Sequence, residues 1–185
     1  GVNLRCRRFA RLRAERVGHA DRIDLRRDGF DHHAAAGVVN AGPWPMKVGQ
    51  PTQFTVHWVI TNYSTDVTNL ELKASLGGNV KFVKVVKSTL DTQPVYNENA
   101  QELRWSIPAL IAGKGLLGAP VEAIVQVEAT PSVAQAGSTM TLFGDTKATA
   151  TDAFTNTDLT AGDALVTTSS LDDPTVKNTE GTVQP

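Results

Sequence analysis

The chain has 185 residues and a formal net charge of −1 at pH 7, which suits one domain of ordinary size with additional segments. Cys6 is the single cysteine, so an intrachain disulfide and a cysteine-based zinc site are excluded. No run of about 18 apolar residues occurs, which excludes a membrane-spanning helix. The N-terminus also lacks the apolar stretch of a secretory signal, so we expect any export signal to belong to a longer precursor.

The first segment, residues 1–42, differs in composition from the rest of the chain. Residues 1–40 contain nine Arg, no Lys and five acidic residues, whereas residues 41–185 contain eight Lys and one Arg. A nucleic-acid-binding arm is disfavoured because acidic residues are interleaved with the arginines and the following domain is acidic. An amphipathic helix is disfavoured because the few apolar residues hold no clean helical period. We therefore expect a poorly structured Arg-rich segment, which is either a disordered tail or GC-rich DNA translated in the wrong frame.

Residues 43–170 predict an all-β fold, an immunoglobulin-like two-sheet sandwich of about seven strands. From Pro51 onward apolar residues recur at every second position, as in strands with one buried face. Trp58 and Trp105 both fall on such apolar faces, where a core position is the usual one. Turn-forming clusters separate the strands, which are expected over 53–62, 67–75, 79–87, 101–107, 121–130, 139–151 and 164–169.

Two parts of the chain do not follow the strand pattern. Within 108–119 we expect Leu110, Ile111, Leu116 and Leu117 to cap one end of the core, because large apolar patches are uncommon on monomers. The alternative is an exposed apolar loop that is used for contact. Residues 171–185 are polar and predict a linker or a frayed C-terminal tail.

Residues 48–76 contain a recognisable series of motifs, namely Val48-Gly49, Pro51, Phe54-Thr55-Val56, Thr61-Asn62, Val67, Asn69-Leu70 and Leu72. With these residues the segment resembles the immunoglobulin-like conserved repeat of large bacterial and archaeal cell-surface proteins. Later segments of the repeat are similar to 103–107, 121–130 and 149–161, so that the resemblance covers about 43–170. Leu76-Gly77-Gly78 departs from it, because the family usually has a Leu-Pro turn there.

The resemblance implies an extracellular, cell-surface module with no shared catalytic residues. We therefore expect a non-catalytic structural or adhesive module of a larger protein, with neighbouring repeats, other surface proteins or glycans as partners. No nucleic acid, membrane insertion, cofactor or metal is expected, and no catalytic or binding residue is assigned. Unpaired edge strands would also permit edge-to-edge self-association. Alternatives are a glycan- or calcium-dependent binding module and an accessory β-domain of a secreted hydrolase.

Two groups of side chains are candidates for sugar binding and for calcium binding. Trp44, Trp58 and Trp105 would stack on sugars if they were exposed together, although we expect Trp58 and Trp105 in the core and Trp44 packed at the edge of the domain. Oxygen ligands for calcium are concentrated near a predicted loop, but their spacing does not match an EF-hand and turn-forming residues are the simpler explanation. These oxygen-bearing residues are Asp152, Asn156, Asp158 and Asp163.

His57 and Asn62 are the remaining candidates. His57 lies on the polar face of its predicted strand with no catalytic motif nearby in the sequence, so we expect a surface histidine. Asn62-Tyr63-Ser64 fits the N-glycosylation sequon, which has a role only in a host that glycosylates.

Overall fold

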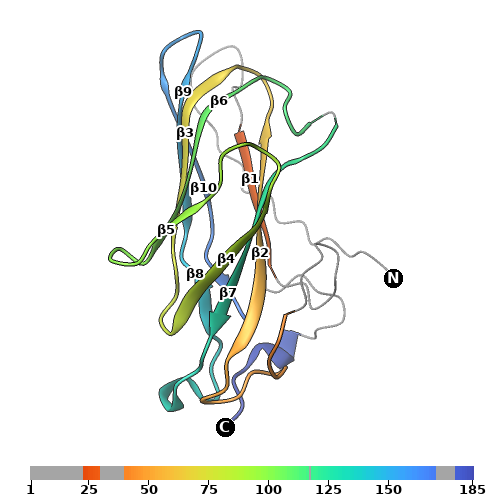
Figure 1. The fold of residues 1–185 in the computed structure, drawn as a ribbon, viewed down its shortest axis with the longest axis vertical. Helices are drawn as coiled ribbons and strands as arrows, with labels where there is room; N and C mark the ends of the chain where they lie inside the picture. Colours follow the sequence, from red (N-terminus) through yellow and green to blue (C-terminus); the bar gives the residue numbers. More distant parts are fainter. Residues whose placement is uncertain (1–22, 30–39, 117, 170–177) are drawn as a thin grey trace.

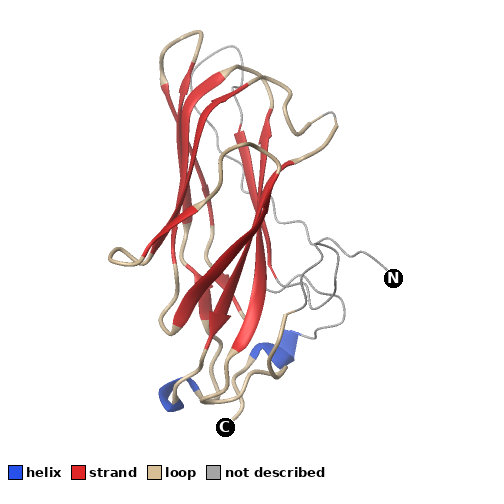
Figure 2. Ribbon diagram, viewed as in Figure 1, coloured by secondary structure: helices blue, strands red, loops and turns tan. Residues whose placement is uncertain are grey.

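The computed structural model describes residues 23–29, 40–116, 118–169 and 178–185. Within these ranges the protein is all-β, with two short 3-10 helices, η1 (Val133–Gln135) and η2 (Asn178–Gly181), as Figure 2 shows. No helix in the described part is long and apolar enough to cross a lipid bilayer. The all-β class predicted from the sequence is therefore confirmed.

Two antiparallel sheets face each other and form a sandwich (Figure 1). The first sheet has the order β1-β2-β7-β4, with β1 at Ile23–Gly29, β2 at Thr52–Asn62, β7 at Val121–Ala129 and β4 at Val80–Ser88. The second has the order β10-β9-β3-β6-β5, with β10 at Asp158–Asp163, β9 at Thr146–Asp152, β3 at Val67–Ser75, β6 at Glu102–Leu110 and β5 at Val95–Asn97. A small pair, β8 (Thr141–Phe143) with β11 (Val166–Thr167), extends one end.

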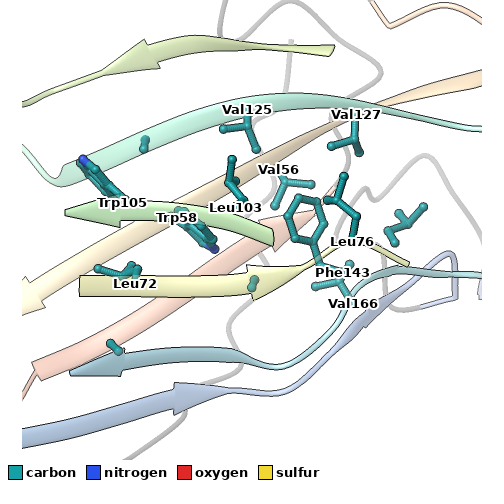
Figure 3. Packing of buried hydrophobic residues seen from close by; sticks show 14 of the residues in the cluster. Val56, Trp58, Leu72, Leu76, Leu103, Trp105, Val125, Val127, Phe143 and Val166 are labelled. Atoms are coloured by element: carbon teal, nitrogen blue, oxygen red, sulfur yellow. The ribbon is translucent and has the colours of Figure 1, made fainter. Parts of the chain in front are cut away.

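The core lies between the two sheets because alternate residues of each strand point inward. Trp58 and Trp105, from opposite sheets, are 1% and 0% exposed, which confirms their predicted core position. Figure 3 shows their indole rings among aliphatic side chains of both sheets. The indole N–H of Trp105 donates to the hydroxyl of Thr92 at 3.0 Å, so this polar group is satisfied at the margin of the core.

A bulge explains why β3 does not alternate strictly. Val67 and Leu70 are both buried although they lie three residues apart. The pairing of β3 with β9 shifts register between Thr68 and Glu71, and Asn69 has φ 51° in the left-handed region. Asparagine tolerates this conformation better than most residues. The shift adds one residue to β3 relative to β9, and Leu70 therefore faces the core although Val67 does so too.

The predicted strands agree with the structure to within a few residues, except that 139–151 is divided into β8 and β9 by Gly144 and Asp145. Three strands, β1, β5 and β10, were not predicted. β1 comes from the Arg-rich N-terminal segment and pairs with the free side of β2, with Leu25 opposite Ile60. The remainder of that segment, 1–22 and 30–39, lies outside the described residues.

The C-terminal residues require a correction. The sequence predicts a linker or a frayed tail over 171–185, of which 171–177 lie outside the described residues. Val183, however, is 1% exposed and belongs to the hydrophobic core, and Gly181 is buried. The buried side chain of Val183 and the backbone hydrogen bonds of the residues around it together attach the end of the chain to the domain.

The free edge formed by β4 has features that oppose pairing with another sheet. Its pairing with β7 shifts register twice, between Phe82 and Lys84 and between Val85 and Lys87. Exposed lysines occur along it at 81, 84 and 87. Irregular, charged edges of this kind disfavour open-ended strand addition. Edge-to-edge self-association remains a prediction, and this edge is an unfavourable place for it.

Candidate functional site: the apolar loop end

Four connections meet at one end of the sandwich. Val67 is paired with both Leu110 and Asp152, and Ile60 with Val121, so that the β2–β3, β6–β7 and β9–β10 connections lie together. The β4–β5 connection lies at the same end, since the backbone N–H of Thr89 donates to the carbonyl of Glu122, at the start of β7, at 2.9 Å. This is the upper end in Figure 1.

Large apolar side chains are exposed at this end. Phe154, in the β9–β10 turn, is 92% exposed, and Ile111 and Leu116, in the β6–β7 connection, are 63% and 49% exposed. We call the two connections that carry Ile111, Leu116 and Phe154 at this end of the sandwich the apolar loop end. The prediction that 108–119 caps the core holds for Leu110, which is buried, and is wrong for Ile111 and Leu116. Leu117 lies outside the described residues.

Asp66 joins the loops that carry these side chains. Its carboxylate Oδ1 accepts a hydrogen bond from the backbone N–H of Ala112 at 2.8 Å. Its backbone carbonyl accepts one from the N–H of Ala153 at 2.8 Å. Ala112 follows Ile111 and Ala153 precedes Phe154, so one residue of the β2–β3 turn fixes the backbone beside two exposed apolar side chains.

Asn62 is hydrogen-bonded to the backbone of the β6–β7 connection. Its side chain is fully buried, and its amide nitrogen lies 2.7 Å from the carbonyl of Thr65 and 3.0 Å from the carbonyls of Leu110 and Ile111. Its backbone N–H donates to the carbonyl of Lys114 at 2.9 Å. The amide nitrogen that a glycan would occupy is therefore enclosed in the folded protein, and the sequon has a structural role.

The β9–β10 turn explains two residues of the calcium hypothesis. Asp152 is 1% exposed, and its Oδ1 accepts hydrogen bonds from the backbone N–H groups of Phe154 and Thr155 at 2.7 and 2.9 Å. Asn156 occupies the left-handed region with φ 56°. Aspartate that bonds its own turn and asparagine at positive φ are both typical turn chemistry.

The other two residues of that hypothesis are far from each other. Asp158 begins β10 and Asp163 ends it, so about five residues of extended strand, roughly 16 Å, separate them. Asp163 accepts a hydrogen bond from the N–H of Ala164 at 2.9 Å. The structure thus does not bring the four oxygen-bearing residues together, and no group of three metal-ligating side chains is found within the described ranges.

The tryptophans do not form a surface for stacking on sugars. Trp58 and Trp105 are buried, and Trp44 is half-buried against Phe54, with ring centroids 6.2 Å apart in an edge-to-face arrangement. This agrees with the prediction that Trp44 packs at the edge of the domain.

His57 has a partner that the sequence did not reveal. Its Nδ1 lies 2.8 Å from Oε1 of Glu122, and the two side chains are 19% and 18% exposed. Glu122 is on the neighbouring strand β7, two residues from Ile124, which lies directly opposite His57. The prediction of a simple surface histidine is therefore corrected to a half-buried pair across two strands.

The sequence analysis missed Phe154 and the two residues that anchor the loops. One signal for Phe154 was available, because it is an aromatic residue in a polar, turn-forming stretch. The anchoring by Asn62 and Asp66 depends on contacts with residues 46 to 87 positions away along the chain, which pattern analysis does not provide.

Comparison with known proteins gives no close relative. No family model matches the sequence, and no curated protein does. Among solved structures, the full-length major pilin SpaD from Corynebacterium diphtheriae is 10% identical with a TM-score of 0.47, covering 78% of this chain and 34% of the pilin. BcpA, the major pilin subunit of Bacillus cereus, is 9% identical with a TM-score of 0.44, covering 79% and 40%.

A third similar structure is the C-terminal domain of the Streptococcus pyogenes antigen I/II-family protein AspA, at 16% identity and a TM-score of 0.36, covering 77% of this chain and 45% of that one. The chain thus spans less than half of the length of each of these three proteins. Identities and TM-scores of this size assign no function to it.

Proposed function

We propose that the chain is a non-catalytic structural and adhesive module of a larger cell-surface protein. We propose further that it contacts neighbouring modules or other surface proteins through the apolar loop end. The observation that carries the proposal is the exposure of Ile111, Leu116 and Phe154 on loops that are hydrogen-bonded to one another. Apolar side chains that are exposed together mark interaction sites when they form a continuous patch, and the proposal is that these three are covered by a partner.

The energetics of such a contact are favourable. Burial of a large apolar side chain contributes about 1.5–3 kcal/mol, so three of them supply a useful part of a specific interface. Binding also costs the ordering of the loops that make the contact. Because Asp66 and Asn62 already hold these loops, much of that ordering occurs during folding and does not weaken the association.

The location at the cell surface is supported by the resemblance of 43–170 to the immunoglobulin-like repeat of surface proteins. The absence of shared catalytic residues in that family supports the non-catalytic part of the proposal. The glycan alternative loses its main support, since two of the three tryptophans are buried.

The proposal is tested with the parent protein displayed on its own cells. A variant that combines Ile111→Ser and Phe154→Ser is expected to reduce cell attachment or cell–cell association at an unchanged amount of surface protein. Val133→Ser provides the matched control, because Val133 is 79% exposed and lies far from the apolar loop end in η1. Equal attachment by both variants and the wild type would contradict the proposed contact surface.

A further inference from the structure

The C-terminal segment lies between two other segments at the end of the sandwich opposite the apolar loop end (Figure 1). Residues 182–184 pair in parallel with 46–48 and antiparallel with 137–139. Two backbone hydrogen bonds, of 2.7 and 3.0 Å, join them to 46–48, and two more, of 2.9 and 3.0 Å, join them to 137–139. A three-residue segment is therefore bound on both sides, as a strand is within a sheet.

The side chains of this segment alternate in burial. Val183 is 1% exposed and belongs to the same core as Met46 and Met140, whereas Gln184 and Pro185 are exposed. The 46–48 and 137–139 segments thus form a slot with one apolar position for the central side chain and open positions after it. Recognition of an extended peptide by backbone pairing with alternate side chains in pockets is the usual mode of strand addition.

The residue before the paired segment is also fixed. The hydroxyl of Thr168 donates to the carbonyl of Gly181 at 2.6 Å and accepts from the backbone N–H of Met140 at 3.0 Å. Thr168 is 1% exposed, and a Cβ atom at Gly181 would overlap with the backbone of Thr168 and Ser169. The slot therefore accepts a glycine two positions before the buried aliphatic residue.

We propose that the segments 46–48 and 137–139 form a peptide-binding slot that takes the C-terminal segment of a second copy of this chain as well as its own. The ligand is an extended Gly-Thr-Val-Gln peptide, with the valine as the buried residue. The backbone hydrogen bonds of the slot and the hydrogen bond of Thr168 are made to residues 181–184, so the same bonds form when a neighbouring copy supplies these residues. Exchange of an identical element between copies is a low-cost route to assembly.

Which copy fills the slot depends on the protein concentration relative to the effective concentration of the chain's own segment. Residues 170–177 connect Ser169 to the segment, and a short connection gives an effective concentration on the order of 1 mM. The segment of the same chain is therefore favoured in dilute solution. Exchange between copies is favoured where copies are crowded above that concentration, because no contact is lost in the exchange.

The first test uses the full chain with a protease recognition sequence in place of 171–176, cleaved after folding. The freed fragment that contains 178–185 is expected to stay bound during gel filtration at micromolar concentration. It is also expected to be displaced by a fluorescent synthetic peptide of residues 178–185, in a saturable anisotropy titration. Loss of the fragment together with failure of the peptide to bind would overturn the slot.

Peptide variants test the chemistry of recognition. The Val183→Asp peptide is expected to bind at least about tenfold more weakly, because burial of a charged carboxylate among apolar side chains is unfavourable. The Gln184→Ala peptide is expected to bind within about threefold of the wild type, because that side chain is exposed. Equal binding of the Val183→Asp peptide would contradict the burial of this side chain in the slot.

The second test uses the intact wild-type chain. Refolding at a concentration above about 1 mM is expected to give dimers that persist after dilution, as measured by light scattering. Refolding in excess of the peptide 178–185 is expected to reduce them, whereas the Val183→Asp peptide is not. Absence of dimers, or dimers that the peptide does not affect, would overturn exchange between copies.

Discussion

The carboxylate of Asp66 lies 2.8 Å from the backbone nitrogen of Ala112, and this hydrogen bond joins the β2–β3 turn to the β6–β7 connection. Asp66 and Ala112 are 46 residues apart in the sequence. The bond holds the backbone next to Ile111, whose side chain is 63% exposed. A polar contact thus determines where an apolar side chain is presented.

Asp66→Ala is expected to loosen the β6–β7 connection. The loss of one exposed hydrogen bond to a carboxylate should lower the free energy of unfolding by about 1 kcal/mol. The larger effect should be local, as faster hydrogen exchange of the Ala112 amide. Asp91→Ala is the control, since it removes another exposed acidic side chain of the same end. Unchanged exchange at Ala112 would show that Asp66 does not position the loop.

Asp152→Ala is expected to destabilise the protein by about 1–3 kcal/mol, because it leaves the N–H groups of Phe154 and Thr155 without their acceptor. Asp158→Ala should have little effect, because that side chain is exposed. Thermal unfolding of the wild type should be the same with Ca²⁺ and with a chelator. A calcium-dependent rise in melting temperature that Asp152→Ala abolishes would instead restore the calcium hypothesis.

Two adjacent glycines are expected to respond differently to a methyl group. A Cβ atom at Gly77 would overlap with the carbonyl oxygen of Thr141, whereas one at Gly78 would meet no atom within 4 Å. Gly77→Ala should therefore lower the free energy of unfolding by about 1–3 kcal/mol. Gly78→Ala should change it by less than about 0.5 kcal/mol. Chemical denaturation of both variants measures these changes. Similar losses of unfolding free energy for the two would contradict the close contact between the backbone at Gly77 and the carbonyl of Thr141.

Trp105→Ala is expected to cost about 3–5 kcal/mol, because a fully buried aromatic ring leaves a cavity between the sheets. Val95→Ala serves as the control, since Val95 is 67% exposed on the short strand β5. The midpoint of urea denaturation measures both. A near-neutral Trp105→Ala would be incompatible with a core built between β2, β6 and β7.

The regular part of this fold could be predicted from the sequence. In β2 and β7 apolar and polar residues alternate along nearly the whole strand, and both strands were predicted to within a residue. The same alternation identified Trp58 and Trp105 as core residues. Periodicity works here because one face of each sheet is buried against the other.

The irregular part could not be predicted in this way. β10 has the sequence DLTAGD at a sheet edge, where few side chains are buried and alternation is weak. The burial of Val183 depends on a backbone slot that no local pattern reveals. Ile111 and Leu116 were expected to cap the core because large exposed apolar patches are uncommon on monomers. Their exposure goes with long-range hydrogen bonds from Asn62 and Asp66 to the loop backbone, which no local pattern reveals.

The proposed function depends on contacts that the apolar loop end makes with a partner. Photo-crosslinking from a reactive residue at position 154, in the parent protein on its own cells, tests this claim most directly. We expect adducts with a neighbouring module or another surface protein from position 154, and none from position 133, whose side chain is also largely exposed. No adduct from position 154, or the same adducts from both positions, would contradict this expectation.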